Sequence, residues 1–335
     1  MADRTFAQLG RIEAIRQLFE GTGYRAFEEP LWFLAKAGDA CTTATKTLLE
    51  GTDFDLVYFP LIHLGYKSVI QVTGELYATM SHPQTLAVSL GVSAKLDFDQ
   101  VKQLWDGIVA AAKEHGYKSL SLDLQPSRNG LCISLSATGS ASKKMYTRRP
   151  KAQSKDLVCV SGSLGAAYLG LQVLEREKSR FDQGVSGRES LEQYKMLVGS
   201  YLKPELSPRT LANLEDEQLC PSFGYFVTRG LSDAVKRLSR DSGLGVKIYA
   251  DKIPFEGNSF ALGKELDIDP ISAAMNGGDD CRLLFTIPIM QLEKFRKDFQ
   301  TFDIIGHLAL PEVGTVLVSP DGLEHPVTAP GWNEE

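Results

Sequence analysis

The sequence lacks the residue patterns that mark a zinc site, a disulfide scaffold or a membrane span. Its five cysteines form no Cys-x-x-Cys pair, and its five histidines show no paired spacing, which argues against the common zinc motifs. Scattered cysteines in a chain of 335 residues favour reduced thiols and therefore predict a cytoplasmic protein. No apolar run reaches the roughly 18 residues that a membrane-spanning helix requires, so we expect no association with membranes.

Positive charge is also scarce relative to negative charge. The formal net charge is −6, so there is no overall basic field to attract nucleic acid, and we expect no nucleic-acid partner. Apolar residues make up 43% of the chain and charged residues 23%, which is ordinary for a globular protein. Residues 1–19 carry charges at the spacing of an amphipathic helix, which we expect in place of a signal peptide.

The length of the chain exceeds what one compact core usually contains, so two domains are expected. Residues 68–80 and 84–93 are rich in β-branched side chains and predict strands, whereas residues 98–116 have apolar residues at helical spacing. A basic, polar stretch at 142–156 is the best candidate for a linker. Helices and strands mix on both sides of it. The sequence therefore predicts an α/β (α+β) chain with domains over 1–141 and 157–335.

Three glycine-containing turns are candidates for a binding site, and "AGDACTT" at 37–43 is the weakest of them. "SGSLGAAYLG" places Gly162 and Gly165 directly before a helix, where backbone N–H groups can bind an anion. The same turn also suits close packing of a strand against a helix. "NGGDDC" places Asp279 and Asp280 at the start of a strand, where two carboxylates either hold a cation or cap a turn. Both pairs of alternatives remain open from the residues alone.

The order of these segments resembles that of the thiamine-monophosphate kinases, members of an ATP-binding superfamily that includes aminoimidazole ribonucleotide synthetase. The resemblance covers nearly the whole chain. It is carried by "LLEGTDFDLVYFPLIHLGYKSV" at 48–69, "LVCVSGSLGAAYLGLQVLEREK" at 157–178, "NGGDDCRLLFTIP" at 276–288, and "GHLALPEVGTVLV" with "GWN" near the end.

The resemblance implies a two-domain fold of the aminoimidazole ribonucleotide synthetase type, with mixed sheets and helices on their outer faces. It also implies a homodimer in which the N-terminal sheets pair. The family reaction is the ATP-dependent phosphorylation of thiamine monophosphate to thiamine diphosphate. Mg²⁺ ions held by aspartates bridge the phosphates, so that the protein positions two anions and neutralises their charge. ATP and Mg²⁺ are therefore the implied cofactors.

The resemblance also assigns site residues. The remaining metal ligands that it implies are Asp39, Glu75, Asp123, Asp279 and Asp280. The residues that it implies for substrate or nucleotide binding are Asp53, Asp123, Arg149, Gly162, Gly165 and Trp332. It assigns no catalytic residue.

The sequence departs from the family at several of the acids that hold metal. Ala40 and Lys46 stand where the family has aspartates, and Phe226 and Arg229 replace both aspartates of a later motif. A cation in place of a carboxylate changes the local charge by two units and repels Mg²⁺. Alternatively, Lys46 and Arg229 pair with the remaining acids in salt bridges. These positions predict a degenerate metal site.

Three functions remain open at this point. The first is a kinase homologue, a pseudoenzyme candidate, whose activity is lost or strongly reduced. The second is an active thiamine-monophosphate kinase with unusual metal ligands. The third is a nucleotide- or phosphate-binding protein of the same fold with another substrate.

Overall fold

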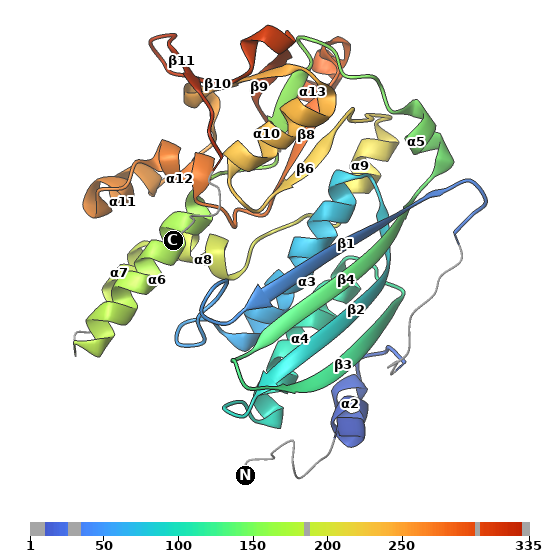
Figure 1. Cartoon of the computed structure of the whole chain (residues 1–335), viewed down its shortest axis with the longest axis vertical. Helices are drawn as coiled ribbons and strands as arrows, with labels where there is room; N and C mark the ends of the chain where they lie inside the picture. Colours follow the sequence, from blue (N-terminus) through green and yellow to red (C-terminus); the bar gives the residue numbers. More distant parts are fainter. Residues whose placement is uncertain (1–10, 26–34, 184–187, 299–301, 330–335) are drawn as a thin grey trace. The chain divides into compact units, whose positions relative to one another are not determined.

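The computed structural model describes residues 11–25, 35–183, 188–298 and 302–329 (Figure 1). Contacts within the chain divide it into two compact units, Met1–Tyr146 and Thr147–Glu335. The dividing point falls within the polar stretch 142–156, where the short helix α5 spans Lys143–Arg148. Each unit has its own sheet, and each is described separately below.

The first unit contains a four-stranded mixed sheet with strand order β1-β4-β2-β3. Neighbouring strands are antiparallel except β2 and β3, which are parallel and are joined through helix α4. Helices α3 and α4 cover one face of the sheet (Figure 1). The elements of this unit are α2 (Arg11–Phe19), β1 (Ala40–Leu49), α3 (Leu61–Ala78), β2 (His82–Ser93), α4 (Phe98–Glu114), β3 (Ser119–Ser127) and β4 (Cys132–Ala141).

Helix α4 is the helix predicted at 98–116. It begins with a capping box in which the Asp97 side chain accepts from Gln100 N and the Gln100 side chain accepts from Asp97 N. It crosses α3 closely, because a β-carbon at Gly107 would lie only 2.0 Å from the carbonyl oxygen of Ile62. This contact packs the two helices closely against each other.

The strand predicted at 68–80 is wrong, because these residues form most of α3 and the turn that follows it. Nearly every residue from Leu64 to Ala78 is buried. A segment buried on almost all sides shows neither alternation nor a polar face, so its periodicity cannot distinguish a helix from a buried strand. Strand β2, by contrast, agrees with the strand predicted at 84–93. It lies inside the sheet between β4 and β3, so it presents no edge.

The face of the first sheet opposite to α3 and α4 carries small polar side chains. Along β4, residues alternate between buried and half-buried, and the half-buried ones include Ser134, Ser136 and Thr138. Hydroxyl groups of neighbouring strands meet on this face, for example Thr47 Oγ1 and Ser134 Oγ at 3.3 Å. We refer to this surface as the hydroxyl face.

The second unit contains a seven-stranded mixed sheet with strand order β11-β10-β7-β9-β5-β8-β6. Only β10 and β7 are parallel neighbours. Its strands are β5 (Leu157–Val160), β6 (Gly224–Val227), β7 (Gly245–Tyr249), β8 (Arg282–Ile287), β9 (Asp303–Ala309), β10 (Thr315–Val318) and β11 (Glu324–Pro326). Its α-helices are α6 (Ala166–Asp182), α7 (Arg188–Gln193), α8 (Lys195–Leu202), α9 (Thr210–Asp216), α10 (Leu231–Ser242), α11 (Ser259–Leu266), α12 (Pro270–Asn276) and α13 (Leu292–Asp298).

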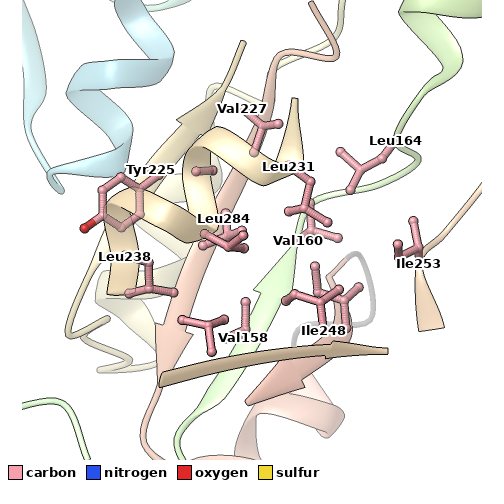
Figure 2. Packing of buried hydrophobic residues seen from close by; sticks show 14 of the residues in the cluster. Val158, Val160, Leu164, Tyr225, Val227, Leu231, Leu238, Ile248, Ile253 and Leu284 are labelled. Atoms are coloured by element: carbon pink, nitrogen blue, oxygen red, sulfur yellow. The ribbon is translucent and has the colours of Figure 1, made fainter. Parts of the chain in front are cut away.

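One core cluster of the second unit lies between its sheet and helix α10. Figure 2 shows that apolar side chains of β5, β6 and β8 point toward those of α10. Leu164 lies in the turn that follows β5, and Leu231 comes directly after the turn that follows β6. Both residues are fully buried in the same cluster. The core therefore fixes the strand ends from which both turns begin.

Candidate functional site

Three turns of the second unit meet at one end of its sheet. Strands β5, β8 and β6 are neighbours, and β8 runs antiparallel to both others. The carboxyl ends of β5 and β6 therefore lie beside the amino end of β8. This topology brings the turn at 161–165, the turn at 228–230 and the turn at 276–281 together. Two of the three glycine-containing turns that the sequence nominates are thus spatial neighbours, whereas the turn at 37–43 belongs to the first unit.

Asp280 connects two of these turns from inside the protein. Its Oδ2 accepts a hydrogen bond from Gly165 N at 2.8 Å, and its Oδ1 accepts from Ala167 N at 3.2 Å. The residue is only 4% exposed. Burial raises the pKa of Asp280 to about 7, against the opposing effects of the two N–H donors and of the Arg282 charge. Asp280 is an internal cap of α6.

This arrangement favours close packing for the first turn and capping for the second, out of the alternatives that the sequence leaves open. The N–H groups before and within the first turn of α6 are directed at the Asp280 carboxylate, so the protein's own anion occupies the position proposed for a phosphate. Gly165 has φ of +75°, and a β-carbon there would lie 2.8 Å from Ala274 N. The turn at 161–165 has the geometry of close packing. Asp280, which the resemblance implies as a metal ligand, caps helix α6 in this structure.

The turn at 276–281 is also joined to the turn after β6. Asp279 N donates to Thr228 O at 2.9 Å, and Cys281 N donates to Val227 O at 2.9 Å. Asp279 itself has a left-handed backbone with φ of +61°. These bonds hold Asp279, which is half-buried, next to the backbone of Arg229.

Phe226 and Arg229, the two positions of the second unit where the resemblance implies aspartates, have different environments. Phe226 lies within β6 opposite Leu283 and is completely buried, so it is a core residue. Arg229 is exposed in the turn that follows. A carboxylate at position 226 would be buried among apolar side chains, which is costly unless it is paired.

The acids of the first unit are dispersed over its sheet and helices. Asp39 precedes β1, where its Oδ1 accepts from Lys143 N at 3.2 Å. Asp123 lies on β3 at the opposite edge of the sheet and accepts from Gln125 Nε2 at 3.1 Å. Their register positions differ by three strands and eight residues, which places them roughly 30 Å apart. One Mg²⁺ ion, with ligands at about 2.1 Å, cannot contact both.

The other predicted residues of the first unit also occupy separate positions. Glu75 is half-buried on helix α3. Asp53 closes the turn after β1, because its Oδ2 accepts from Leu49 N at 2.8 Å. Ala40 is the first residue of β1, and Lys46 lies within the same strand opposite Leu135. Both sites of substitution therefore belong to an edge strand.

No group of three or more His, Cys, Asp or Glu residues that could hold a metal ion occurs among the described residues. The salt bridges suggested for Lys46 and Arg229 are likewise absent from the described part of each residue's own unit. Two predicted binding residues remain. Arg149 is exposed just after α5. Burial raises the pKa of the Cys220 thiol, and the charge of Arg149 lowers it by a smaller amount. Trp332 lies outside the described residues.

Sequence reasoning overlooked Arg282. The residue follows Cys281 directly and begins β8. Its Nε donates to Ser163 O at 3.3 Å, and its Nη1 donates to Glu205 O at 3.3 Å. A charged residue at the start of a strand, two positions after a pair of acids, is the signal that could have directed attention to it.

Comparisons with known proteins identify the class of this fold. No family model matches the chain. Curated relatives include a thiamine-monophosphate kinase of Aquifex aeolicus, 23% identical over 286 residues, covering 85% of this chain and 87% of the relative. Another, from Pyrococcus horikoshii, is 28% identical over 280 residues and covers 80% and 78%.

Solved structures agree with these sequence matches. The thiamine monophosphate kinase of Aquifex aeolicus superposes with a TM-score of 0.71 at 22% identity, covering 89% of this chain and 92% of that one. The hydrogenase maturation protein HypE of E. coli gives 0.72 at 17% identity, covering 96% and 98%. The chain therefore has the aminoimidazole ribonucleotide synthetase-like fold. Within that fold, it is a distant homologue of the thiamine-monophosphate kinases, as predicted.

Two related structures contain bound ligands. AaThiL has been solved with AMPPCP and TMP, with a TM-score of 0.69 to this chain at 22% identity, covering 97% and 100%. A HypE has been solved with ATP. In the described part of this chain, no helix is both long and apolar enough to cross a membrane.

Proposed function

We propose that this chain is a thiamine-monophosphate kinase homologue that binds a nucleotide or another phosphate compound and has lost most or all of the family's phosphoryl transfer. The family reaction needs divalent ions between the two phosphates, because the transferred group carries negative charge that the protein alone does not neutralise. The proposal therefore depends on how many metal-holding acids this chain retains.

The observation that carries the proposal is the fate of the acids in the second unit. Of the two replaced positions there, Phe226 is core and Arg229 is a cation. Of the two acids that remain, Asp280 is buried and bonded to Gly165 and Ala167. Asp279 alone is left as a possible oxygen ligand from these turns. Mg²⁺ is octahedral and usually takes one or two carboxylates besides phosphates and water, so the residues present do not fit the family's set of several ions.

The electrostatic cost of the substitutions points the same way. A charge about 4 Å from a divalent ion contributes roughly 4 kcal/mol per unit of charge product at an effective dielectric constant of 20. By the resemblance, Lys46 and Arg229 each stand where the family has an aspartate, so each changes the local charge by two units. Such a site favours an anion over a metal ion.

A second candidate is a nucleotide-binding protein of the same fold that acts on another substrate. The observation that favours it is the similarity to HypE, whose TM-score of 0.72 is close to the 0.71 and 0.69 of the two kinase structures. Here too the reacting group would have to be activated without the kinase's full set of metal ligands. The two candidates differ in whether thiamine monophosphate binds at all.

The test is a single-turnover assay with the purified chain, Mg²⁺, ATP and thiamine monophosphate, in which thiamine diphosphate is separated and quantified. The Aquifex aeolicus kinase serves as the positive control. We expect product at less than about one thousandth of an ordinary enzymatic rate, because two lost contacts of 2–3 kcal/mol each slow a reaction by roughly that factor. Turnover of about 1 per second or faster would identify an active kinase with unusual ligands.

We also propose that the chain forms a homodimer through the hydroxyl face of the first sheet. The support is the hydroxyl face itself, whose short side chains let a second sheet approach at the usual separation of about 10 Å. Half-buried serines and threonines can form hydrogen bonds with their equivalents in a second copy.

A further inference from the structure

Arg282 lines a cavity that the proposed function does not use. The cavity has a volume of about 270 Å³ and lies beside the turn that follows β5. Its polar lining consists of Ser161, Glu205, Ser207, Thr210, Asn213 and Arg282, and its apolar lining of Leu206, Leu283 and Phe302. All these residues belong to the second unit. We call it the Arg282 cavity.

The charge of Arg282 is not neutralised by a direct partner. Its guanidinium is half-buried and donates only to two neutral carbonyl oxygens, those of Ser163 and Glu205. Among the described residues, no carboxylate lies within 4.0 Å of it. The Asp280 carboxylate influences Arg282 through space but is bonded to the N terminus of α6. A guanidinium has five N–H donors in a planar fork, so donors remain for a ligand.

Two hydroxyl groups add to these donors. Ser161 Oγ accepts from Leu283 N at 2.9 Å, and Ser207 Oγ accepts from Arg209 N at 3.3 Å. Each oxygen thus has a fixed N–H donor, and its own O–H proton has no acceptor among the described residues. Both protons can be directed into the cavity that the two serines line. The Arg282 cavity therefore offers a planar cation and two hydroxyl donors in one place.

The size and the apolar wall of the cavity restrict the ligand further. Ligand sites usually measure roughly 300–1,000 Å³, so a cavity of about 270 Å³ suits a compact molecule better than an entire nucleotide. The Phe302 ring, which stacks on Phe285 with centroids 5.8 Å apart, forms part of an apolar wall. An oxyanion that carries a small apolar group satisfies both halves of the lining.

We infer that the Arg282 cavity binds a compact organic oxyanion, a phosphate monoester or a carboxylate, whose charged group contacts Arg282, Ser161 and Ser207 and whose apolar part packs against Phe302 and Leu206. Bidentate contacts between arginine and either group are among the strongest hydrogen bonds in proteins. The inference rests on the lining of this cavity alone, so it stands whether or not the chain is a kinase.

The test is isothermal titration of the full chain with phenyl phosphate, benzoate, inorganic phosphate and AMPPCP. Phenyl phosphate or benzoate binds at micromolar to millimolar concentration, more tightly than inorganic phosphate because the ring adds apolar contact. Comparison of the two aromatic probes distinguishes a phosphate from a carboxylate ligand. In Arg282→Gln, binding of the better aromatic probe weakens about ten- to hundredfold, whereas AMPPCP binding is unchanged.

Two further variants separate the site from general effects of charge and folding. Arg240→Gln removes one positive charge from an exposed residue that pairs with Asp241, and it leaves binding of the aromatic probe unchanged. Asn213→Trp places a large ring at an exposed position of α9 that lines the cavity, and it blocks the probe without any change of charge. It carries the test if Arg282→Gln proves poorly folded by circular dichroism.

Three results would overturn the inference. The first is that neither aromatic probe binds the unmodified chain. The second is that both Arg282→Gln and Asn213→Trp bind the probe as the unmodified chain does. The third is that Arg282→Gln weakens AMPPCP as strongly as it weakens the aromatic probe, which would make the cavity part of the nucleotide site.

Discussion

Replacement of Asp280 should alter both the stability of the protein and its dependence on pH. Asp280→Ala leaves the N–H groups of Gly165 and Ala167 without their acceptor in a buried position. Each unsatisfied buried donor costs roughly 1–3 kcal/mol, so the free energy of unfolding should fall by about 2–5 kcal/mol. Asp280→Asn keeps the shape and one acceptor oxygen, so it should cost about 1–2 kcal/mol.

The pH dependence follows from the raised pKa of Asp280. In the folded protein this pKa is about 7, and its ordinary value is 3.8. The folded state therefore binds the proton more tightly than the unfolded state. The stabilisation from this proton is complete below 3.8 and disappears as the pH rises toward and through 7. Between pH 5 and pH 8 the unmodified protein should lose roughly 3 kcal/mol from this residue alone.

Chemical unfolding at several pH values from 5 to 8 measures both effects. The difference in unfolding free energy between the unmodified protein and Asp280→Asn should shrink, or change sign, as the pH rises, because asparagine does not titrate there. Asp216→Asn, at an exposed position of α9, is the matched control and should show a constant difference. A difference that grows with pH would mean that the N–H groups of α6 hold Asp280 ionised, and the reasoning from burial would be refuted.

Three further predictions concern packing and assembly. Gly165→Ala should lower the free energy of unfolding in urea by at least about 3 kcal/mol, because left-handed backbone strain adds to a steric clash. Gly116 also has a left-handed backbone, with φ of +74°, but no atom lies within 4 Å of a β-carbon built there. Gly116→Ala should therefore cost only about 1–2 kcal/mol. Equal losses would show that the contact at Gly165 relaxes. Phe226→Asp should lower the free energy of unfolding by more than about 4 kcal/mol, or prevent folding. An aspartate at this position therefore cannot by itself restore a metal site. A stable variant would indicate that β6 can expose this position. In sedimentation, Ser136→Arg on the hydroxyl face should convert the dimer to a monomer, whereas the control Asn129→Arg in the exposed β3–β4 loop should not. An unmodified chain that sediments as a monomer would contradict the proposed dimer.

Much of the fold could be predicted from the sequence because local patterns determine it. The helix at 98–116 has apolar residues at regular spacing and its own capping box, and both signals lie within the segment. The strand-turn-helix at 157–178 and the strand after "NGGDDC" are short units whose glycines mark their ends. Helix α3 escaped prediction because burial on nearly all sides removes the polar face from which a helix is recognised.

The candidate site was less predictable because its interactions join residues far apart in the chain. The sequence identified the turn at 161–165 and the turn at 276–281, but no local pattern shows that Asp280 caps the helix that begins after Gly165. That bond links residues 115 positions apart. The dispersal of Asp39 and Asp123 also depends on strand order, which spacing along the chain does not reveal. The substitutions at 226 and 229 were readable, whereas the complete burial of Phe226 was not.

The most direct test of the central claim is calorimetry of AMPPCP binding in the presence of Mg²⁺ and, separately, of EDTA. If cations replace the metal-holding acids, the affinity for AMPPCP with Mg²⁺ and the affinity with EDTA should agree within about threefold. Both affinities should fall as the salt concentration rises. Binding that requires Mg²⁺, or that Mg²⁺ tightens by more than about tenfold, equivalent to 1.4 kcal/mol, would contradict the claim and indicate a working metal site.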